Sequence, residues 1–395
     1  MSKAETVAVA EAADEAGGSS TVTPRRQRRW KAPRWAWVCT VLGAVLILLS
    51  SGVLVGYRTL VARYEGAINQ QDLFDDKAAH AAPKKSTITG PLNILLVGVD
   101  VRPGSTNAPL ADSIMILSVD EDLQSAFLFS LPRDLLVEIP AFPKADFHGG
   151  TYKLNSAMAE GSLIPGAERP DTAAGFELLA KTVSAATGIE RFDAGAIINF
   201  SGFRKIVDAM GGVEMYIERD VVSEHRKPDG THRDPNPYGE GYVGPQAQYK
   251  KGTRQLNGWQ ALDYVRQRYP ANGVPDADYG RQRHQQQFIK AMAAKATSAD
   301  VIADPLKLDR VLRAAGESLI FSGRGNGIAE FAYALRGIRP EAIQMIKLPA
   351  TNVGVGDAYQ GEQFLPVAQE FFTALGKGQA AAFVVEHPGL ISTTQ

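Results

Sequence analysis

The sequence has little cysteine and no excess of charge of one sign. Its single cysteine, Cys39, cannot form a disulfide within the chain, so stability must come from a buried core. Its 42 lysines and arginines are balanced by 43 acidic residues in a chain of 395. With 45% hydrophobic and 22% charged residues, the composition excludes collagen-like, disordered and disulfide-scaffold proteins and leaves an ordinary globular chain.

Motifs that identify some enzyme classes by spacing alone are also absent. The six histidines show neither HExxH spacing nor close pairing, which argues against zinc. Neither GxGxxG nor a Walker A loop occurs, and GxSxG is missing. The sequence therefore gives no sign of a zinc enzyme, a dinucleotide-binding protein, a P-loop protein or a serine hydrolase.

Residues 36–55 carry no charge over about twenty residues, enough for a helix to cross a hydrocarbon core of about 30 Å. Basic residues without any acid directly precede this run: Arg25, Arg26, Arg28, Arg29, Lys31 and Arg34. The positive-inside rule places the N-terminus in the cytoplasm and everything after residue 57 outside. A cleaved signal peptide is the alternative, and the long run and long preceding tail argue against it.

The balanced total charge hides two unlike parts. Residues 1–34 have seven basic and four acidic residues, whereas the rest of the chain has a net charge of −4. A basic stretch can indicate nucleic-acid binding, but beside an apolar run a topological role is favoured. The acidic remainder and its outside location argue against DNA binding, so no nucleic-acid partner is expected.

We expect five segments along the chain. Residues 1–34 form a disordered basic cytoplasmic tail, and residues 35–57 a transmembrane helix. Residues 58–90 form a short amphipathic juxtamembrane helix followed by a linker. Residues 91–378 form one extracytoplasmic domain, and residues 379–395 a loose C-terminal tail.

The outer domain alternates short apolar runs with helical patterns. Strands are predicted at 93–99, 113–119, 125–131, 194–200 and 213–218, and helices at 174–187, 202–210, 258–265 and 281–296. Mixed strands and helices predict an α/β class, specifically a three-layer α/β/α sandwich with a mixed central sheet.

Charged residues stand at the ends of the first three predicted strands. Asp100 follows the first strand, Asp112 precedes the second, and Arg133 and Asp134 follow the third. If these strands run antiparallel in sequence, all four groups meet at one edge of the sheet. Two carboxylates near an arginine suit a divalent cation and a phosphate, because Mg²⁺ is held by one or two carboxylates, water and phosphate oxygens. The alternative is that the aspartates only form turns.

A second charged cluster follows later in the chain. Four arginines lie within eighteen residues: Arg266, Arg268, Arg281 and Arg283. Arg266 and Arg268 share a face if the preceding helix ends near Tyr264 and the chain is then extended. Asp278 is a plausible N-cap for the next helix, on which Arg281, Gln285 and Phe288 share one face. Converging guanidiniums suit a pyrophosphate, and a solvated face of ion pairs is the alternative.

Six stretches together match one known family in order and spacing. They are NILLVGVDVRPG (93–104), ADSIMILSVD (111–120), FSLPRDLLVEIP (129–140), KLNSAMAEG (153–161), INFSGFRKIVDAMGGVEMYI (198–217) and LNGWQALDYVRQRY…DYGRQRHQQQF (256–288). In these stretches the chain resembles the LytR-CpsA-Psr family of bacterial cell-wall glycopolymer ligases.

The resemblance implies a fold with an apolar pocket for a polyprenyl chain and a Mg²⁺-dependent phosphotransferase activity, with Mn²⁺ as a possible substitute. The donor would be a polyprenyl-pyrophosphate-linked glycan, and the acceptor would be the muramic acid of peptidoglycan. The protein would also contact membrane lipid. Two other readings stay open. The chain could bind polyprenyl pyrophosphate as a membrane-anchored regulator without turnover, or hydrolyse the pyrophosphate with water in place of the sugar acceptor.

The resemblance also implies roles for individual residues. Asp100 and Asp112 would bind the metal, and one of them could accept the hydroxyl proton. Asp112, Arg133 and Arg266 would be catalytic. The pyrophosphate site would comprise Arg102, Arg133, Lys153, Arg266, Arg268, Asp278, Arg281 and Gln285.

Two positions depart from the family's pattern. Leu110 and Ala111 stand where members often have Arg-Ser or similar, so any arginine role there is lost or passes to Arg102. His284 stands where many members have a second arginine, which would weaken one phosphate contact or make it depend on pH.

Overall fold

The computed structural model describes residues 69–74, 88–100, 106–268 and 277–392, without the side chains of residues 69, 70, 277, 278, 302, 305 and 329. The apolar run 36–55, Cys39 and Arg102 lie outside the described residues. Within the described ranges, no helix combines the length and apolarity that a membrane span requires.

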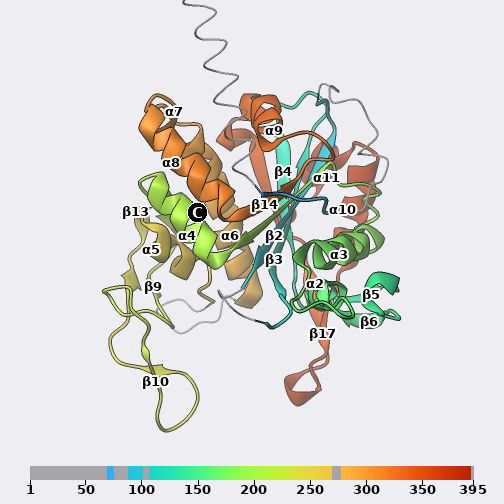
Figure 1. Ribbon diagram of the computed structural model, residues 1–395, viewed down its shortest axis with the longest axis horizontal. Helices are drawn as coiled ribbons and strands as arrows, with labels where there is room; N and C mark the ends of the chain where they lie inside the picture. The colour runs from blue at the N-terminus through green and yellow to red at the C-terminus, as the bar shows by residue number, and fades with distance from the viewer. Residues whose placement is uncertain (1–68, 75–87, 101–105, 269–276, 393–395) are drawn as a thin grey trace, which may run out of the picture. The chain divides into compact units, whose positions relative to one another are not determined.

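A seven-stranded mixed sheet forms the centre of the domain (Figure 1). Its strands, in spatial order, are β1 (Asn69–Gln70), β14 (Leu319–Ser322), β7 (Ala194–Asn199), β2 (Leu92–Val99), β3 (Ala111–Val119), β4 (Ala126–Leu131) and β15 (Ile343–Ile346). β2, β3 and β4 are successively antiparallel, as predicted, whereas β7 runs parallel to β2 and β15 parallel to β4. The expected α/β class with a mixed central sheet is confirmed.

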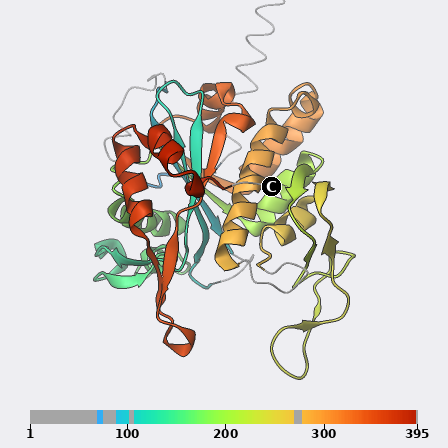
Figure 2. The same cartoon turned by 180° about the vertical axis from the view of Figure 1, so that it is seen from behind.

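Helices cover both faces of the sheet because its strands are apolar on both faces (Figures 1 and 2). Along β2, Leu95 and Val97 are buried in the core on one face of the sheet. Ile94 and Leu96 pack in the smaller cores on the other face. The first core is closed by α2 (Ser156–Ser162), α3 (Thr172–Thr187), α10 (Pro366–Gly376) and α11 (Ala380–Glu386). The other side carries α4 (Phe200–Ala209), α5 (Gly258–Tyr264), α6 (Ala277–Ala296) and α8 (Pro305–Gly316).

Smaller elements complete the described chain. They are β5 (Leu136–Ile139), β6 (Gly150–Lys153), β8 (Val213–Ile217), β13 (Gly252–Leu256), α7 (Ala299–Ile302), α9 (Ile328–Ala334), β16 (Ala350–Val353), β17 (Gly361–Phe364) and the 3-10 turns Pro143–Ala145, Leu335–Gly337, Pro340–Ala342, Gly356–Ala358 and Pro388–Leu390. The pairs β5–β6, β8–β13 and β16–β17 are antiparallel and lie outside the main sheet.

Residues 221–249, which we call the arm, lead from β8 to β13 and contain β9 (Val221–Val222), β10 (Asp234–Pro235), β11 (Tyr242–Val243) and β12 (Gln248–Tyr249). The Arg233 guanidinium closes the base of its outer loop by donating to the carbonyls of Glu224, Tyr242 and Gly244. Figures 1 and 2 show the arm and the β16–β17 hairpin projecting from the same side of the sheet.

At Gly230 the backbone of the arm packs closely against Trp259 of α5. A Cβ at Gly230, whose φ is +84°, would lie 2.8 Å from the Trp259 indole, so only glycine fits this backbone approach.

The predictions for the two chain ends are wrong where the structure describes these residues. The juxtamembrane helix predicted within residues 58–90 does not include Asn69–Gln70, which form β1 parallel to β14, and Leu73 is fully buried in the first core. Residues 58–68 and 75–87 lie outside the described residues. A loose tail was expected for residues 379–395, but α11 and the turn Pro388–Leu390 bury Ala380, Val384 and Leu390 in the same core.

Candidate functional site

The predicted carboxylates meet at one end of the β2–β3 hairpin. The strand register pairs Gly98 with Ser113 and Val99 with Ala111, so Asp112 is the extra residue of a β-bulge. Bulges re-aim a side chain at the rim of a sheet and are common beside functional sites. Asp100 follows Val99 directly, which places both carboxylates at the same end of the hairpin, as the sequence predicts.

Arg133 reaches the bulge from the turn after β4. Its Nη1 donates to Asp112 Oδ1 at 2.7 Å, and its Nε lies 3.8 Å from Asp134 Oδ2. The backbone N–H of Asn155, at the start of α2, donates to the Arg133 carbonyl at 2.9 Å. The arginine is therefore fixed through its backbone as well as through its guanidinium.

Lys153 joins the same group from the end of β6. Its Nζ lies 3.6 Å from Asp134 Oδ1 and 4.9 Å from the centre of the Tyr359 ring. Tyr359 belongs to the β16–β17 hairpin, and the N–H of Glu362 donates to the Asp134 carbonyl at 2.8 Å. This hairpin is thus attached to the site by backbone and side chain.

Arg266 lies two residues beyond the end of α5. That helix begins with a capping box between Asn257 and Gln260 and ends at Tyr264, as predicted. Arg266 Nη2 lies 3.8 Å from Asp100 Oδ2, and its Cζ lies 4.3 Å from the centre of the Phe200 ring. A cation over an aromatic face adds about 0.5–1 kcal/mol where the site is exposed.

Phe200 takes this position because β7 ends and α4 begins there. Asn199 caps α4 by accepting a hydrogen bond from the N–H of Gly202 at 2.8 Å. The cap sets the first residue of the helix, Phe200, against the arginine.

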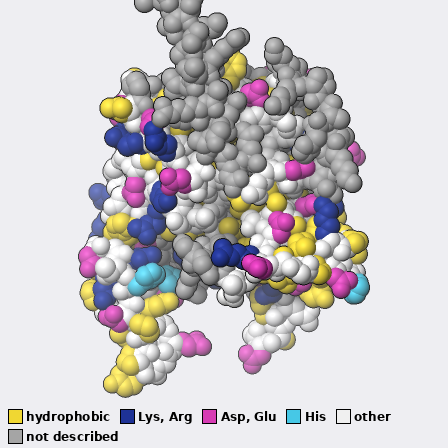
Figure 3. All heavy atoms as spheres, viewed as in Figure 1, with side chains coloured by type: hydrophobic (Ala, Val, Ile, Leu, Met, Phe, Trp, Pro, Cys, Tyr) yellow, Lys and Arg dark blue, Asp and Glu magenta, His cyan; other side chains and the backbone are white. Residues whose placement is uncertain are grey.

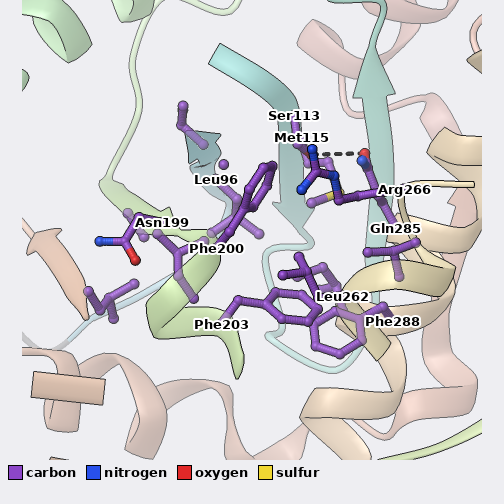
Figure 4. Close-up of a pocket in the computed structure, with 17 residues that line it drawn as sticks. Leu96, Ser113, Met115, Asn199, Phe200, Phe203, Leu262, Arg266, Gln285 and Phe288 are labelled. Carbon is purple, nitrogen blue, oxygen red and sulfur yellow. Dashed lines mark hydrogen bonds between the residues drawn. The ribbon is translucent and has the colours of Figure 1, made fainter. Parts of the chain in front are cut away.

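An apolar cavity of about 170 Å³ adjoins these charges (Figure 4). Its lining includes Leu96, Met115, Phe200, Phe203, Leu262 and Phe288. Phe203 and Phe288 stack with ring centres 4.1 Å apart. Ser113, Arg266 and Gln285 lie together at one side of the cavity, where Ser113 Oγ donates to Gln285 Oε1 at 2.9 Å. The cavity therefore has apolar walls and a polar side next to the charged groups.

The helix face predicted on α6 is partly confirmed. Gln285 and Phe288 line the cavity, while Arg281, one turn earlier, is buried. Asp278 is the second residue of α6, so the prediction that it caps the helix is wrong, because the helix begins earlier, at Ala277. Arg268 follows Arg266 by two residues and is partly buried.

His284 does not face the cavity. Its ring is buried and stacks on that of Tyr264, with centres 4.4 Å apart and planes 25° apart. Burial raises the pKa of Tyr264, so its phenol stays protonated. His284 therefore fills space between α5 and α6.

Three residues of the site were not predicted from the sequence: Ser113, Phe200 and Tyr359. Ser113 and Phe200 adjoin strand ends, a signal that was available. Tyr359 lies about two hundred residues from Lys153 along the chain, and no local pattern connects the two.

On the face seen in Figure 3, basic and acidic side chains are interspersed with apolar ones. Ion pairs at the ends of β2, β3, β4 and β6 lie beside a cavity with apolar walls. This combination defines a class of α/β protein suited to an amphiphile with an anionic head. The chain belongs to the LytR_cpsA_psr family, which matches residues 58–375.

Individual relatives are distant. The chain is 28% identical over 234 residues to Biofilm regulatory protein A of Streptococcus mutans, covering 58% of this chain and 49% of that protein. It is 27% identical over 365 residues to the cell wall biosynthesis protein LcpA of Corynebacterium glutamicum, covering 86% and 65%. The chain thus spans about half the length of the first relative and just under two thirds of the second.

Among solved structures, TagT bound to LI-WTA shares the fold. The TM-score is 0.50 at 21% identity, covering 75% of this chain and 95% of that one.

Proposed function

We propose that the protein is a Mg²⁺-dependent phosphotransferase that moves a glycopolymer from a polyprenyl-pyrophosphate carrier to a hydroxyl of muramic acid in peptidoglycan. One observation carries the proposal: two arginine–aspartate pairs, Arg133–Asp112 and Arg266–Asp100, lie beside an apolar cavity. Membership of the family, the name of LcpA and the LI-WTA in the TagT structure support it.

The cavity would hold part of the polyprenyl chain, and the cations would hold the pyrophosphate. A guanidinium binds phosphate through two parallel hydrogen bonds, which an ammonium cannot do. Arg133 and Arg266 would therefore set the orientation of the phosphates, and Lys153 would add charge. Without a ligand, their charges are balanced by Asp112, Asp100 and Asp134.

Asp100 and Asp112 fit a magnesium ion by their chemistry. Mg²⁺ uses one or two carboxylates and completes its shell with water and phosphate oxygens. The described residues contain no group of three or more acidic, histidine or cysteine ligands, which agrees with a site that the substrate completes. When bound, Mg²⁺, or Mn²⁺ in its place, would neutralise charge on the phosphate oxygens.

In the reaction, the muramic acid hydroxyl attacks the sugar-side phosphorus in line. A new O–P bond forms, the bond between the two phosphates breaks, and polyprenyl phosphate leaves with the electron pair. Asp112 or Asp100 accepts the hydroxyl proton. Arg133 and Arg266 stabilise charge on the transferring and leaving oxygens, the main contribution in phosphoryl transfer.

We also propose that residues 36–55 anchor the chain in the cell membrane with its N-terminus in the cytoplasm and the domain outside. Donor and protein would then share one membrane, which raises the local concentration of the donor.

The test is transfer of a lipid-pyrophosphate-linked sugar to peptidoglycan fragments in the presence of Mg²⁺. Arg133→Ala and Arg266→Ala should each lower glycan transfer by at least about 100-fold while circular dichroism stays unchanged. Arg313→Ala is the matched control, because Arg313 also pairs with an aspartate, Asp309 at 2.8 Å, but lies on α8. Full activity of either site variant would overturn the proposal.

The name of the streptococcal relative favours a second candidate, a regulator that binds the carrier without turnover. The same assay separates the candidates by where the glycan ends. Glycan on the acceptor indicates the transferase, free sugar phosphate indicates hydrolysis, and an unchanged donor indicates binding alone.

A further inference from the structure

A buried hydrogen-bond network lies directly behind Arg266 and Arg268. Between these arginines, Gln267 is only 3% exposed. Its Nε2 donates to the Asp263 carbonyl at 2.9 Å and to Asp263 Oδ1 at 3.0 Å. Its Oε1 accepts the N–H of Glu224, in the arm, at 2.9 Å. The amide of Gln267 is thus fixed on both sides.

Asp263 is the centre of the network. It lies in the last turn of α5 and is only 4% exposed. Its Oδ2 accepts the phenol of Tyr249, from β12 of the arm, at 2.6 Å. Burial and the neighbouring carboxylate raise the pKa of Tyr249, so the phenol remains a donor. Each carboxylate oxygen therefore has a hydrogen-bond donor, as a buried charge requires.

The same carboxylate is a counter-charge for nearby cations. Burial lowers the pKa of Arg226 in the arm, Asp263 opposes that shift, and Arg204 and Arg266 add to it. Asp263 therefore lies within electrostatic range of cations that repel each other. Removing its charge would leave that repulsion uncompensated.

We propose that Asp263, Gln267 and Tyr249 are positioning residues that hold Arg266 in place for the pyrophosphate, with the arm as part of this support. Residues 265–268 belong to no helix or strand, and Gln267 is held there by hydrogen bonds to α5 and to the arm. This inference rests on the proposed function only in taking pyrophosphate as the ligand of Arg266.

The test measures the affinity of the full-length protein for inorganic pyrophosphate with Mg²⁺ by calorimetry. Gln267→Ala and Tyr249→Phe should each weaken binding about tenfold, since residues in one network couple strongly. In an Arg266→Ala background, the same substitutions should change affinity less than about twofold, because the group they position is gone. Tyr249→Phe keeps the ring and removes only the hydroxyl, so the test does not depend on one variant folding.

Gln286→Ala is the matched control. Gln286 is also a buried glutamine, and its Nε2 donates to Ser130 Oγ and the Ile346 carbonyl at 3.1 Å, away from the cavity. It should lower stability and leave pyrophosphate affinity unchanged.

Two results would overturn the inference: full affinity in both network variants, or equal losses with and without Arg266. The first result, together with a large loss in Arg266→Ala, would refute only the positioning role. Full affinity in Arg266→Ala would instead count against the proposed site itself.

Discussion

At the scale of single residues, the site is a set of opposite charges at the domain surface. Asp112 and Arg133, Asp100 and Arg266, and Asp134 and Lys153 are all partly exposed pairs. Such pairs contribute at most about 1 kcal/mol to stability. Substitutions here should therefore change ligand binding and transfer far more than folding.

Asp112→Asn gives a direct test of this separation. Transfer should fall by more than about 100-fold, because the substitution removes a proposed metal ligand and proton acceptor. Pyrophosphate affinity measured without metal should be kept or increased, because Arg133 no longer pairs with a charged partner. Asp309→Asn, which alters an aspartate–arginine pair on α8, should change neither quantity. Normal transfer by Asp112→Asn would contradict the role of this residue.

His225 in the arm provides a prediction on pH. Its burial lowers its pKa below 6.5, with Arg266 and Arg226 adding to this effect and Glu224 and Asp263 opposing it. The unfolded chain then binds a proton more readily, so the free energy of unfolding should fall as the pH drops from about 6.5 towards the lower, folded pKa. Above that range His225 is neutral in both states and contributes no pH dependence.

Urea unfolding at about pH 7.5 and about pH 5.5 checks this prediction, with His225→Gln as the comparison. The variant should lose less stability between the two values. A titration midpoint for His225 above 6.5 in an NMR experiment would show that the sign is wrong.

Position along the chain was enough to predict some of these residues and not others. Asp100, Asp112 and Arg133 stand at strand ends, and antiparallel pairing of three consecutive strands brings strand ends together. Asp263 gave no such signal, because a polar residue on a helix is usually solvated. It is buried, and its partner Tyr249 comes from the arm, which no local pattern connects to α5.

At the scale of elements, α6 is held by polar contacts on two sides. Gln286 bonds to β4 and to the end of β15, while Arg283 and Gln287 bond to Glu218 at the end of β8. The helix therefore has no simple apolar stripe. Its place against the sheet follows from these bonds as much as from apolar packing.

Glu218→Ala should lower the free energy of unfolding by about 2–3 kcal/mol, because it leaves Arg283 and Gln287 without their acceptor in a mostly buried setting. The side chains of Glu218 and Arg283 are 10% and 17% exposed. Glu317→Ala is the control, since its pair with Lys205 is 65% and 54% exposed and should cost less than about 1 kcal/mol. Equal losses in urea unfolding would contradict this reading of α6.

Long apolar runs made the central strands and main helices predictable, but short elements were not. β1 has two residues, and its pairing with β14 spans about 250 positions of sequence. The alanine-rich C-terminal segment was predicted to be a loose tail, because its sequence has no strong apolar pattern. Ala380 and Val384 are buried because they pack against the first core, which residues far away in the sequence form. The structures of both segments therefore depend on residues that are remote in sequence.

At the scale of the whole molecule, the proposed topology predicts opposite fates for the two ends of the chain. Protease added to spheroplasts should digest the domain after residue 57 and spare the N-terminal tail. The double substitution Leu46→Arg, Leu48→Arg should release the protein from the membrane fraction, because charges at the centre of an apolar span are costly. Sedimentation of that variant with membranes would contradict the anchor.

The closed base of the arm also makes its outer loop a suitable place for a probe. Arg233 fixes the carbonyls on both sides of the loop, so changes beyond it need not reach the site. Tyr238 in this loop is 96% exposed, and Cys39 is the only thiol in the chain. In a Cys39→Ser background, Tyr238→Cys would therefore take a single maleimide dye, and its fluorescence would report whether added peptidoglycan fragments contact this loop.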